Sequence, residues 1–141
     1  MGYVLDTNAL NRLVDAELSF DAFPEGAELI ASHIQIDEIN NTSDKERRAR
    51  LFLVLAKHVK KIVPTETAIV GVSRIDNSKI GDGVRYKAIL DALNSRNGRK
   101  KNNVQDALIG EIALANKHIL VTADRDLAEV VESMGGSVMR P

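Results

Sequence analysis

The sequence predicts an α/β fold, a three-layer α/β/α sandwich with a mostly parallel central sheet. Short apolar runs recur along the chain, and between them lie longer segments whose apolar residues follow helical spacing. Strands that alternate with helices form parallel βαβ units, with helices on both faces of the sheet. A chain of 141 residues without internal repeats or low-complexity segments fits one domain, which we expect to span residues 1–141.

The first half of the chain contains strands and helices in alternation, with two helices in succession before its last strand. Thr7 or Asn8 can cap the first helix, and Ser32 has the capping-box spacing to Gln35 that starts the second. Pro64 closes the last element of this half. In chain order we expect a strand at 3–5, a helix from 7 or 8, a connector at 20–26, a strand at 27–31, a helix from 32, a polar break at 40–44, a helix at 45–59 and a short strand or extended exit at 60–64.

The second half continues the alternation. Periodicity does not decide whether residues 68–72 form a strand or a helical turn. Asn103 can cap the longest helix of this half, and Gly135 and Gly136 end the last one. In order we expect a turn-rich stretch at 76–83, a helix at 84–93, a polar basic loop at 94–103, a helix at 103–117, a strand at 119–122, a helix at 126–134 and a strand at 138–139.

The composition excludes several classes of protein and leaves many open. The chain has no cysteine, which excludes disulfides and thiolate metal sites. No apolar run approaches the roughly 18 residues of a membrane helix, and Asp6 interrupts the first apolar run before a signal sequence could form. A net charge of −1 gives no overall attraction to nucleic acid, so such a role would need a local basic patch. We expect a cytoplasmic protein that contacts no membrane.

Four acidic residues lie at the ends or beginnings of the expected elements: Asp6, Glu38, Asp106 and Asp124. Asp6 and Asp124 end apolar strands, whereas Glu38 and Asp106 lie early in helices. Ligands of α/β sheets bind beyond the carboxyl ends of the strands, and carboxylates gathered there repel one another unless a cation neutralises them. The pattern therefore predicts a site for Mg²⁺ or Mn²⁺ with oxygen ligands.

Two of these acids also have a purely structural interpretation. Asp6 alone would more often cap the helix that follows it, and Asp106 could simply interact with the dipole of its helix. The four acids together favour metal binding for Asp6. The apolar neighbours Val104 and Ala107 favour a ligand role for Asp106, because an acid that is only solvated would not need to lie beside apolar residues.

The same motifs resemble those of PIN domains over essentially the whole chain. The resemblance is carried by Val4-Leu5-Asp6-Thr7-Asn8, by the early-helix glutamate, by Asp106-Ala107-Leu108-Ile109 and by residues 121–127, Val-Thr-Ala-Asp-Arg-Asp-Leu. The length fits the single-domain VapC-type toxins of bacteria and archaea. The resemblance implies Mg²⁺- or Mn²⁺-dependent cleavage of single-stranded RNA, a cognate antitoxin as partner, and a homodimer.

The resemblance also decides between neighbouring acids. It favours Glu38 over Asp37, which we expect to be solvated, and it favours Asp124 at the fourth acidic position. Asp126 is expected to cap a helix, although it could support a second metal ion. Thr122 matches a position at which the family has a hydroxyl. It could hydrogen-bond a carboxylate or a metal-bound water, or it could be only a β-branched residue of the strand.

A basic stretch precedes Asp106 in the expected loop: Arg96, Arg99, Lys100 and Lys101. Charged loops are usually only solvated. This one leads into the helix that carries a proposed ligand, so it could bind the phosphates that flank the cleaved bond. The chain has no tryptophan and few other aromatic residues, so recognition should depend on backbone charge and RNA shape more than on base stacking.

Two other functions remain as alternatives. A receiver-type phosphoacceptor domain also gathers acids around Mg²⁺ at strand ends, but it would need a lysine at the end of a late strand, and none follows residues 119–122. A PIN-like domain that has lost catalysis and only binds partners is the second alternative. The intact acids argue against it.

Overall fold

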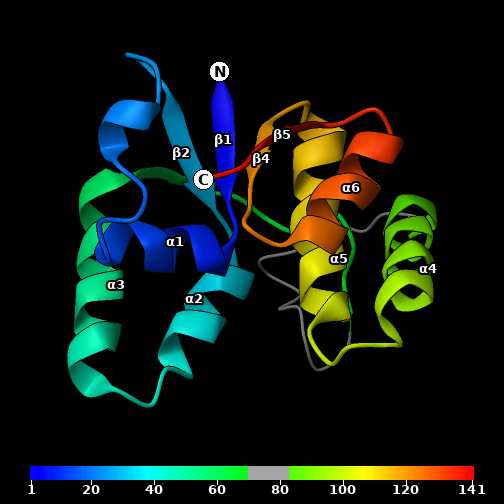
Figure 1. Ribbon diagram of the computed structural model, residues 1–141, viewed down its shortest axis with the longest axis horizontal. Helices are drawn as coiled ribbons and strands as arrows, with labels where there is room; N and C mark the ends of the chain where they lie inside the picture. Colours follow the sequence, from blue (N-terminus) through cyan, green and yellow to red (C-terminus); the bar gives the residue numbers. More distant parts are fainter. Residues whose placement is uncertain (70–82) are drawn as a thin grey trace.

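The computed structural model, which describes residues 1–69 and 83–141, contains a five-stranded sheet between two groups of helices (Figure 1). The strand order is β3-β2-β1-β4-β5, and all four pairings are parallel. The fold class predicted from the sequence is therefore confirmed. The strands are β1 (Gly2–Leu5), β2 (Glu28–Ala31), β3 (Val59–Ile62), β4 (Ile119–Val121) and β5 (Ser137–Met139).

The helices follow the order of the strands. The chain moves outward from β1 to β3 through the first three helices and then returns past β1 to β4 and β5 through the last three. These groups lie on opposite sides of the sheet in Figure 1. The helices are α1 (Thr7–Val14), α2 (His33–Asn40), α3 (Lys45–His58), α4 (Val84–Asn97), α5 (Asn103–Asn116) and α6 (Arg125–Ser133), with a short 3-10 helix, η1, at Phe20–Ala22.

Two apolar cores fill the spaces on either side of the sheet. Successive side chains of a strand point to opposite faces, so Val4 of β1 packs with α4, α5 and α6, whereas Leu5 packs with α1 and α3. Helix α2 belongs to both cores, through Ile34 on one side and Ile39 on the other. All four side chains are at most 2% exposed. This alternation fixes the direction in which Asp6, the residue after β1, points.

The strand order creates a switch point between β1 and β4, because the connections leave these neighbouring strands in opposite directions. Ligand sites of open α/β sheets lie beyond the carboxyl ends of the strands at such a point. The observed order also differs from the 2-1-3-4-5 order of flavodoxin-like receiver domains. The topology therefore rules out the receiver-type alternative.

Several element boundaries differ from those expected. Asp6, and not Thr7 or Asn8, caps α1, since its side chain accepts from the Thr7 backbone and its carbonyl starts the helix. Helix α6 begins at Arg125 with Asp124 as its cap, so Asp126 is not the cap we expected. The expectations for residues 68–72 and 76–83 fall largely outside the described residues.

The expected basic loop is shorter than predicted, because α4 continues to Asn97. Gly98, with a φ of 70°, ends it in the left-handed conformation that glycine adopts without strain. Arg96 is therefore a helical residue and not a loop residue. Asn103 is not the cap of α5 but its first residue, and its buried side chain hydrogen-bonds Asn97, at 3.0 and 2.8 Å, and Asn94. Among the described residues, no helix is long and apolar enough to cross a membrane.

Candidate active site

Asp6 lies at the switch point and is held by the end of β4, by Thr122 directly after it and by the first turn of α1. Its backbone N–H donates to the Val121 carbonyl at 3.0 Å, which ties the end of β1 to the end of β4. Its side chain is only 3% exposed. One carboxylate oxygen accepts from the Thr7 backbone at 2.7 Å, and the other accepts from Asn8 Nδ2 and Thr122 Oγ1, both at 2.9 Å. The carboxylate of Asp6 therefore has a fixed place and direction.

Thr122 joins Asp6 to Asp124. Its hydroxyl donates to Asp6 and accepts from the Asp124 backbone N–H at 3.0 Å, and the side chain is fully buried. Asn8 holds the same turn, since its Oδ1 accepts from the Ala123 backbone at 2.9 Å. Asp124 Oδ1 accepts from the Leu127 backbone at 3.2 Å. Thr122 thus hydrogen-bonds a carboxylate, the first of the two roles considered for it.

Sequence reasoning missed two polar residues that position Asp6. We expected Asn8 only as a helix cap, whereas its amide bridges β1 and the turn after β4. Gln35 forms the expected capping box with Ser32, but its Nε2 also donates to the Leu5 carbonyl at 2.9 Å, directly before Asp6. A glutamine in a capping box gives no sequence signal for such a bond. Its partner lies 30 residues away.

Glu38 and Asp106 approach the same place from α2 and α5, which contact each other. Both side chains are partly buried. Glu38 Oε1 is buried without a hydrogen-bond partner among the described residues. A buried carboxylate oxygen without a donor costs free energy, so it marks a place where a cation or water belongs.

Mutual repulsion and burial together shift the pKa values of three of the acids. Burial raises the pKa of Asp6 to about 6, with a contribution from the charge of Asp124, although hydrogen bonds oppose the rise. Burial and the charge of Asp6 raise the pKa of Glu38 to about 7, although the Thr7 hydroxyl opposes the rise. Burial and the charges of Asp6, Asp124 and Glu38 raise the pKa of Asp106 to about 8. The structure thus brings the four predicted acids into one electrostatic cluster.

The cluster fits a divalent ion that keeps several waters better than an ion whose ligands all come from the protein. Among residues 1–69 and 83–141, no three acidic or histidine side chains are arranged to hold an ion directly. Mg²⁺ usually keeps several waters and uses one or two carboxylates, so direct contact with all four acids is not required. The unpartnered oxygen of Glu38, the raised pKa values and the all-oxygen donor set fit such an ion.

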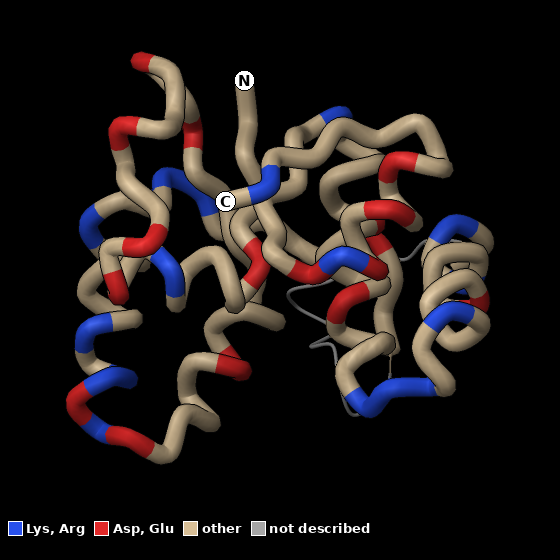
Figure 2. Tube along the Cα trace, in the orientation of Figure 1, with Lys and Arg blue, Asp and Glu red and all other residues tan. Residues whose placement is uncertain are grey.

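The basic residues and Asp126 were also predicted to belong to the site, and only some of them lie beside the acids. Arg96 forms ion pairs with Asp126, at 3.4 Å, and with Glu129, and these pairs join α4 to α6. Arg99, Lys100 and Lys101 form an exposed basic turn before α5, which is the continuous blue segment between α4 and α5 in Figure 2. Lys100 lies near enough to Asp106 to oppose the rise of its pKa. The basic turn is thus adjacent to the acidic cluster, whereas Arg96 and Asp126 bind each other.

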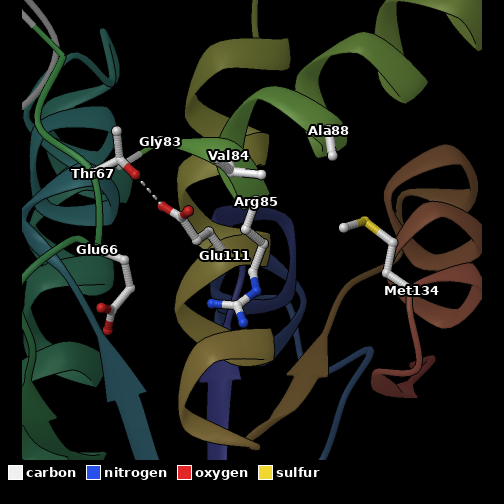
Figure 3. Close-up of a pocket in the computed structure, with 8 residues that line it drawn as sticks. All are labelled: Glu66, Thr67, Gly83, Val84, Arg85, Ala88, Glu111 and Met134. Carbon is white, nitrogen blue, oxygen red and sulfur yellow. Dashed lines mark hydrogen bonds between the residues drawn. The ribbon is translucent and has the colours of Figure 1, made fainter. Parts of the chain in front are cut away.

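A cavity of about 450 Å³ lies apart from the cluster and contains none of its four acids (Figure 3). Glu111 of α5 is 3% exposed there and accepts a hydrogen bond from Thr67 at 2.7 Å. Burial raises the pKa of Glu111, and the Thr67 hydroxyl opposes the rise. This buried pair connects the segment after β3 to α5 and gives Glu111 a structural role.

Solved structures with the same fold include two VapBC structures. The structure of VapBC2 from Rickettsia felis bound to a promoter DNA fragment matches with a TM-score of 0.64 at 15% identity, covering 99% of this chain and 98% of that one. VapBC-1 from nontypeable Haemophilus influenzae matches with a TM-score of 0.63 at 18% identity, again over 99% and 98%. A domain of a functionally unknown protein from Methanocaldococcus jannaschii matches with a TM-score of 0.53 at 15% identity, covering 99% of this chain and 90% of that one.

No protein-family model and no curated protein sequence matches the chain. At identities this low, the structural likeness establishes the fold alone. The chain thus has the fold of these VapBC chains along almost its full length. This is the fold that the resemblance to PIN domains predicted.

Proposed function

We propose that the protein is a metal-dependent endoribonuclease that hydrolyses phosphodiester bonds of single-stranded RNA. The observation that carries this proposal is the convergence of Asp6, Glu38, Asp106 and Asp124 at the switch point, where three of them have raised pKa values. A cluster of this charge is unfavourable unless a divalent cation is part of it. Phosphodiester hydrolysis is a reaction for which such a cluster is suited.

The residues of the chain would share the work of the reaction. When bound, Mg²⁺ or Mn²⁺ supplies charge neutralisation for the phosphate and activation of the attacking water. Asp6 is the most rigid of the proposed ligands, because Thr7, Asn8 and Thr122 all donate to its carboxylate. Glu38 Oε1 has no donor at hydrogen-bond distance within the described residues, although the Thr7 hydroxyl lies near the carboxylate, so this oxygen can accept a proton or a hydrogen bond from water.

The proposal extends to the biological role. The matched VapBC chains and the resemblance to VapC-type toxins support the toxin of a toxin–antitoxin pair, with a cognate antitoxin as partner. A homodimer and a cytoplasmic location belong to the same proposal. Arg99, Lys100 and Lys101 would bind phosphates of the RNA next to the acids, whereas Arg96 contributes less because its guanidinium is already paired.

The experiment that tests the proposal is a cleavage assay with the purified protein. Single-stranded RNAs of mixed sequence are incubated with Mg²⁺, Mn²⁺ or EDTA and separated on a denaturing gel. We expect internal cleavage with either metal ion and none in EDTA. Intact RNA in both metal ions, with a folded protein that still binds an antitoxin, would instead support the catalytically silent alternative.

Replacing Thr122 by valine should lower kcat by about 10- to 100-fold, the usual effect of removing a residue that orients a metal ligand. The variant keeps the shape of the side chain but loses the hydroxyl between Asp6 and the Asp124 backbone. KM should change little, since RNA contacts stay intact. Thr122→Ser should restore most of the activity. A Thr122→Val variant as active as the wild type would show that the hydroxyl only fills space.

A further inference from the structure

A second cavity, of about 400 Å³, lies directly beside the acidic cluster. Thr122, Ala123 and Asp124 form one wall of it. The rest of the lining comes from separate parts of the chain and is mostly charged: Arg12, Arg125, Glu129, Arg140 and Pro141. The cavity therefore shares Asp124 with the candidate active site and adds basic groups that the sequence analysis did not single out.

Three elements bring the arginines together. Arg12 lies in the last turn of α1, Arg125 is the first residue of α6, and Arg140 follows β5. More than 100 residues separate Arg12 from the other two along the chain. Only the parallel order of β1, β4 and β5 places them around one cavity, which is why no local sequence motif marks the group.

Each guanidinium is held by a neighbouring glutamate at the protein surface. Arg125 Nε pairs with Glu129 at 2.8 Å, and Arg140 pairs through two nitrogens with Glu132, at 3.1 and 2.5 Å. Ion pairs between solvent-exposed side chains are weak, so they orient the arginines without burying them. Within the described residues, both terminal nitrogens of Arg125 make no hydrogen bond, and its side chain is 88% exposed.

Arg12 is held in the same weak way. Its Nη1 contacts Glu17 at 3.3 Å, with side chains that are 39% and 55% exposed. The guanidinium has five N–H donors, so most of its hydrogen-bonding capacity remains for a ligand. All three arginines can therefore offer donors to an anion in the cavity without breaking a buried interaction.

The chemistry of the lining favours a phosphate group. Guanidinium groups bind phosphate oxygens through paired hydrogen bonds. Each of the three arginines is already paired with one glutamate, so a phosphate would be recognised by the guanidinium N–H donors that remain unpaired and not by an excess of positive charge. The lining contains no aromatic side chain on which a base could stack. A site of this kind contacts the backbone of a nucleic acid and tolerates many base sequences.

We infer that this cavity binds the RNA phosphate next to the one that is cleaved, through Arg12, Arg125 and Arg140. The inference rests on the proposed nuclease function for its ligand. Its geometry, however, is independent of the basic turn at residues 99–101, which lies beside Asp106 rather than Asp124. The RNA strand would thus be held on two flanks of the acidic cluster, and the arginine cavity would fix its register.

Binding of RNA without cleavage tests the inference. A fluorescently labelled single-stranded RNA is titrated with protein in EDTA, at several salt concentrations, and followed by anisotropy. The triple variant Arg12→Gln, Arg125→Gln and Arg140→Gln should bind at least about tenfold more weakly. Its salt dependence should flatten by about 0.7 in log–log slope for each phosphate that the variant no longer neutralises. DNA of the same sequence should lose affinity equally, because the arginines bind phosphate.

A charge-matched variant provides the control. Arg50→Gln, Lys57→Gln and Lys87→Gln removes the same charge from exposed positions of α3 and α4, and it should keep the wild-type slope. If the triple arginine variant does not fold, the exposed Arg125→Gln alone should still weaken binding about threefold. Equal affinity and slope for wild type and arginine variants would overturn the inference. Because the binding assay contains no free metal ion, weaker binding by the arginine variants would support the inference even if the protein cleaves no RNA.

Discussion

Replacing Asp6 by asparagine is expected to reduce RNA cleavage by more than about 100-fold, since loss of a residue that merely orients a metal ligand already costs about 10- to 100-fold. Asparagine keeps the oxygen that accepts from the Thr7 backbone, so α1 remains capped. It removes the charge that a divalent ion needs and replaces one carboxylate oxygen by a donor, which faces Asn8 and Thr122. The rate is measured in the RNA cleavage assay, with circular dichroism as the measure of folding.

Asp44→Asn is the matched control for this variant. Asp44 caps α3 as Asp6 caps α1, but it is exposed and does not raise the pKa of any acid of the cluster. Its asparagine variant should cleave RNA at the wild-type rate. Full activity of a folded Asp6→Asn variant would remove Asp6 from the mechanism. A similar loss of activity in both variants would indicate a general effect of capping substitutions.

The second large effect is a loss of stability as the pH rises without metal. In the folded protein the pKa values of Asp6, Glu38 and Asp106 are raised to about 6, 7 and 8. The unfolded chain releases these protons at lower pH, so the folded state binds more protons in between. The free energy of unfolding therefore falls as the pH rises from about 4 to about 8, by about 1.4 kcal/mol for each unit of raised pKa that is realised.

Asp106→Asn should remove the largest part of this dependence. The pKa of Asp106 is the most raised of the three, mainly by burial and then by the charges of the other acids. We expect the metal-free variant at pH 8 to be more stable than the wild type by on the order of 3 kcal/mol, and equally stable at pH 4. Urea unfolding in EDTA at a series of pH values measures this. A wild-type protein whose stability rises between pH 4 and pH 8 would contradict the account.

Parts of the fold and the site were predictable because they depend on local patterns. The strands are short apolar runs, and the capping box of Ser32 and Gln35 fixes the start of α2. The acids could be identified because strand ends and helix starts meet at a switch point, whatever the details between them. The period of the apolar residues and the rule that parallel strands end at the same edge predict these features, whereas the resemblance to PIN domains decided for Glu38 over Asp37 and for Asp124 at the fourth position.

Other features depend on side-chain contacts between elements, some of them close along the chain and others distant, which the sequence does not reveal. Residues 94–97 are polar and were expected to belong to a loop, but α4 continues to Asn97, and Asn94 and Asn97 hydrogen-bond Asn103. For the same reason Arg96 meets Asp126 and Glu129 across two helices instead of facing RNA from a loop. The arginine cavity is a third case, since its lining residues converge only in the folded sheet.

The most direct test of the central claim is to locate Mn²⁺ in crystals of the protein by its anomalous scattering. The account predicts a peak at the carboxyl ends of β1 and β4, in direct contact with the Asp6 carboxylate and with at least one other acid of the cluster. Waters should complete its coordination. The Asp6→Asn variant should lose the peak under the same conditions. A wild-type crystal with Mn²⁺ bound only at other places, or with no ordered ion at the acids, would contradict the account.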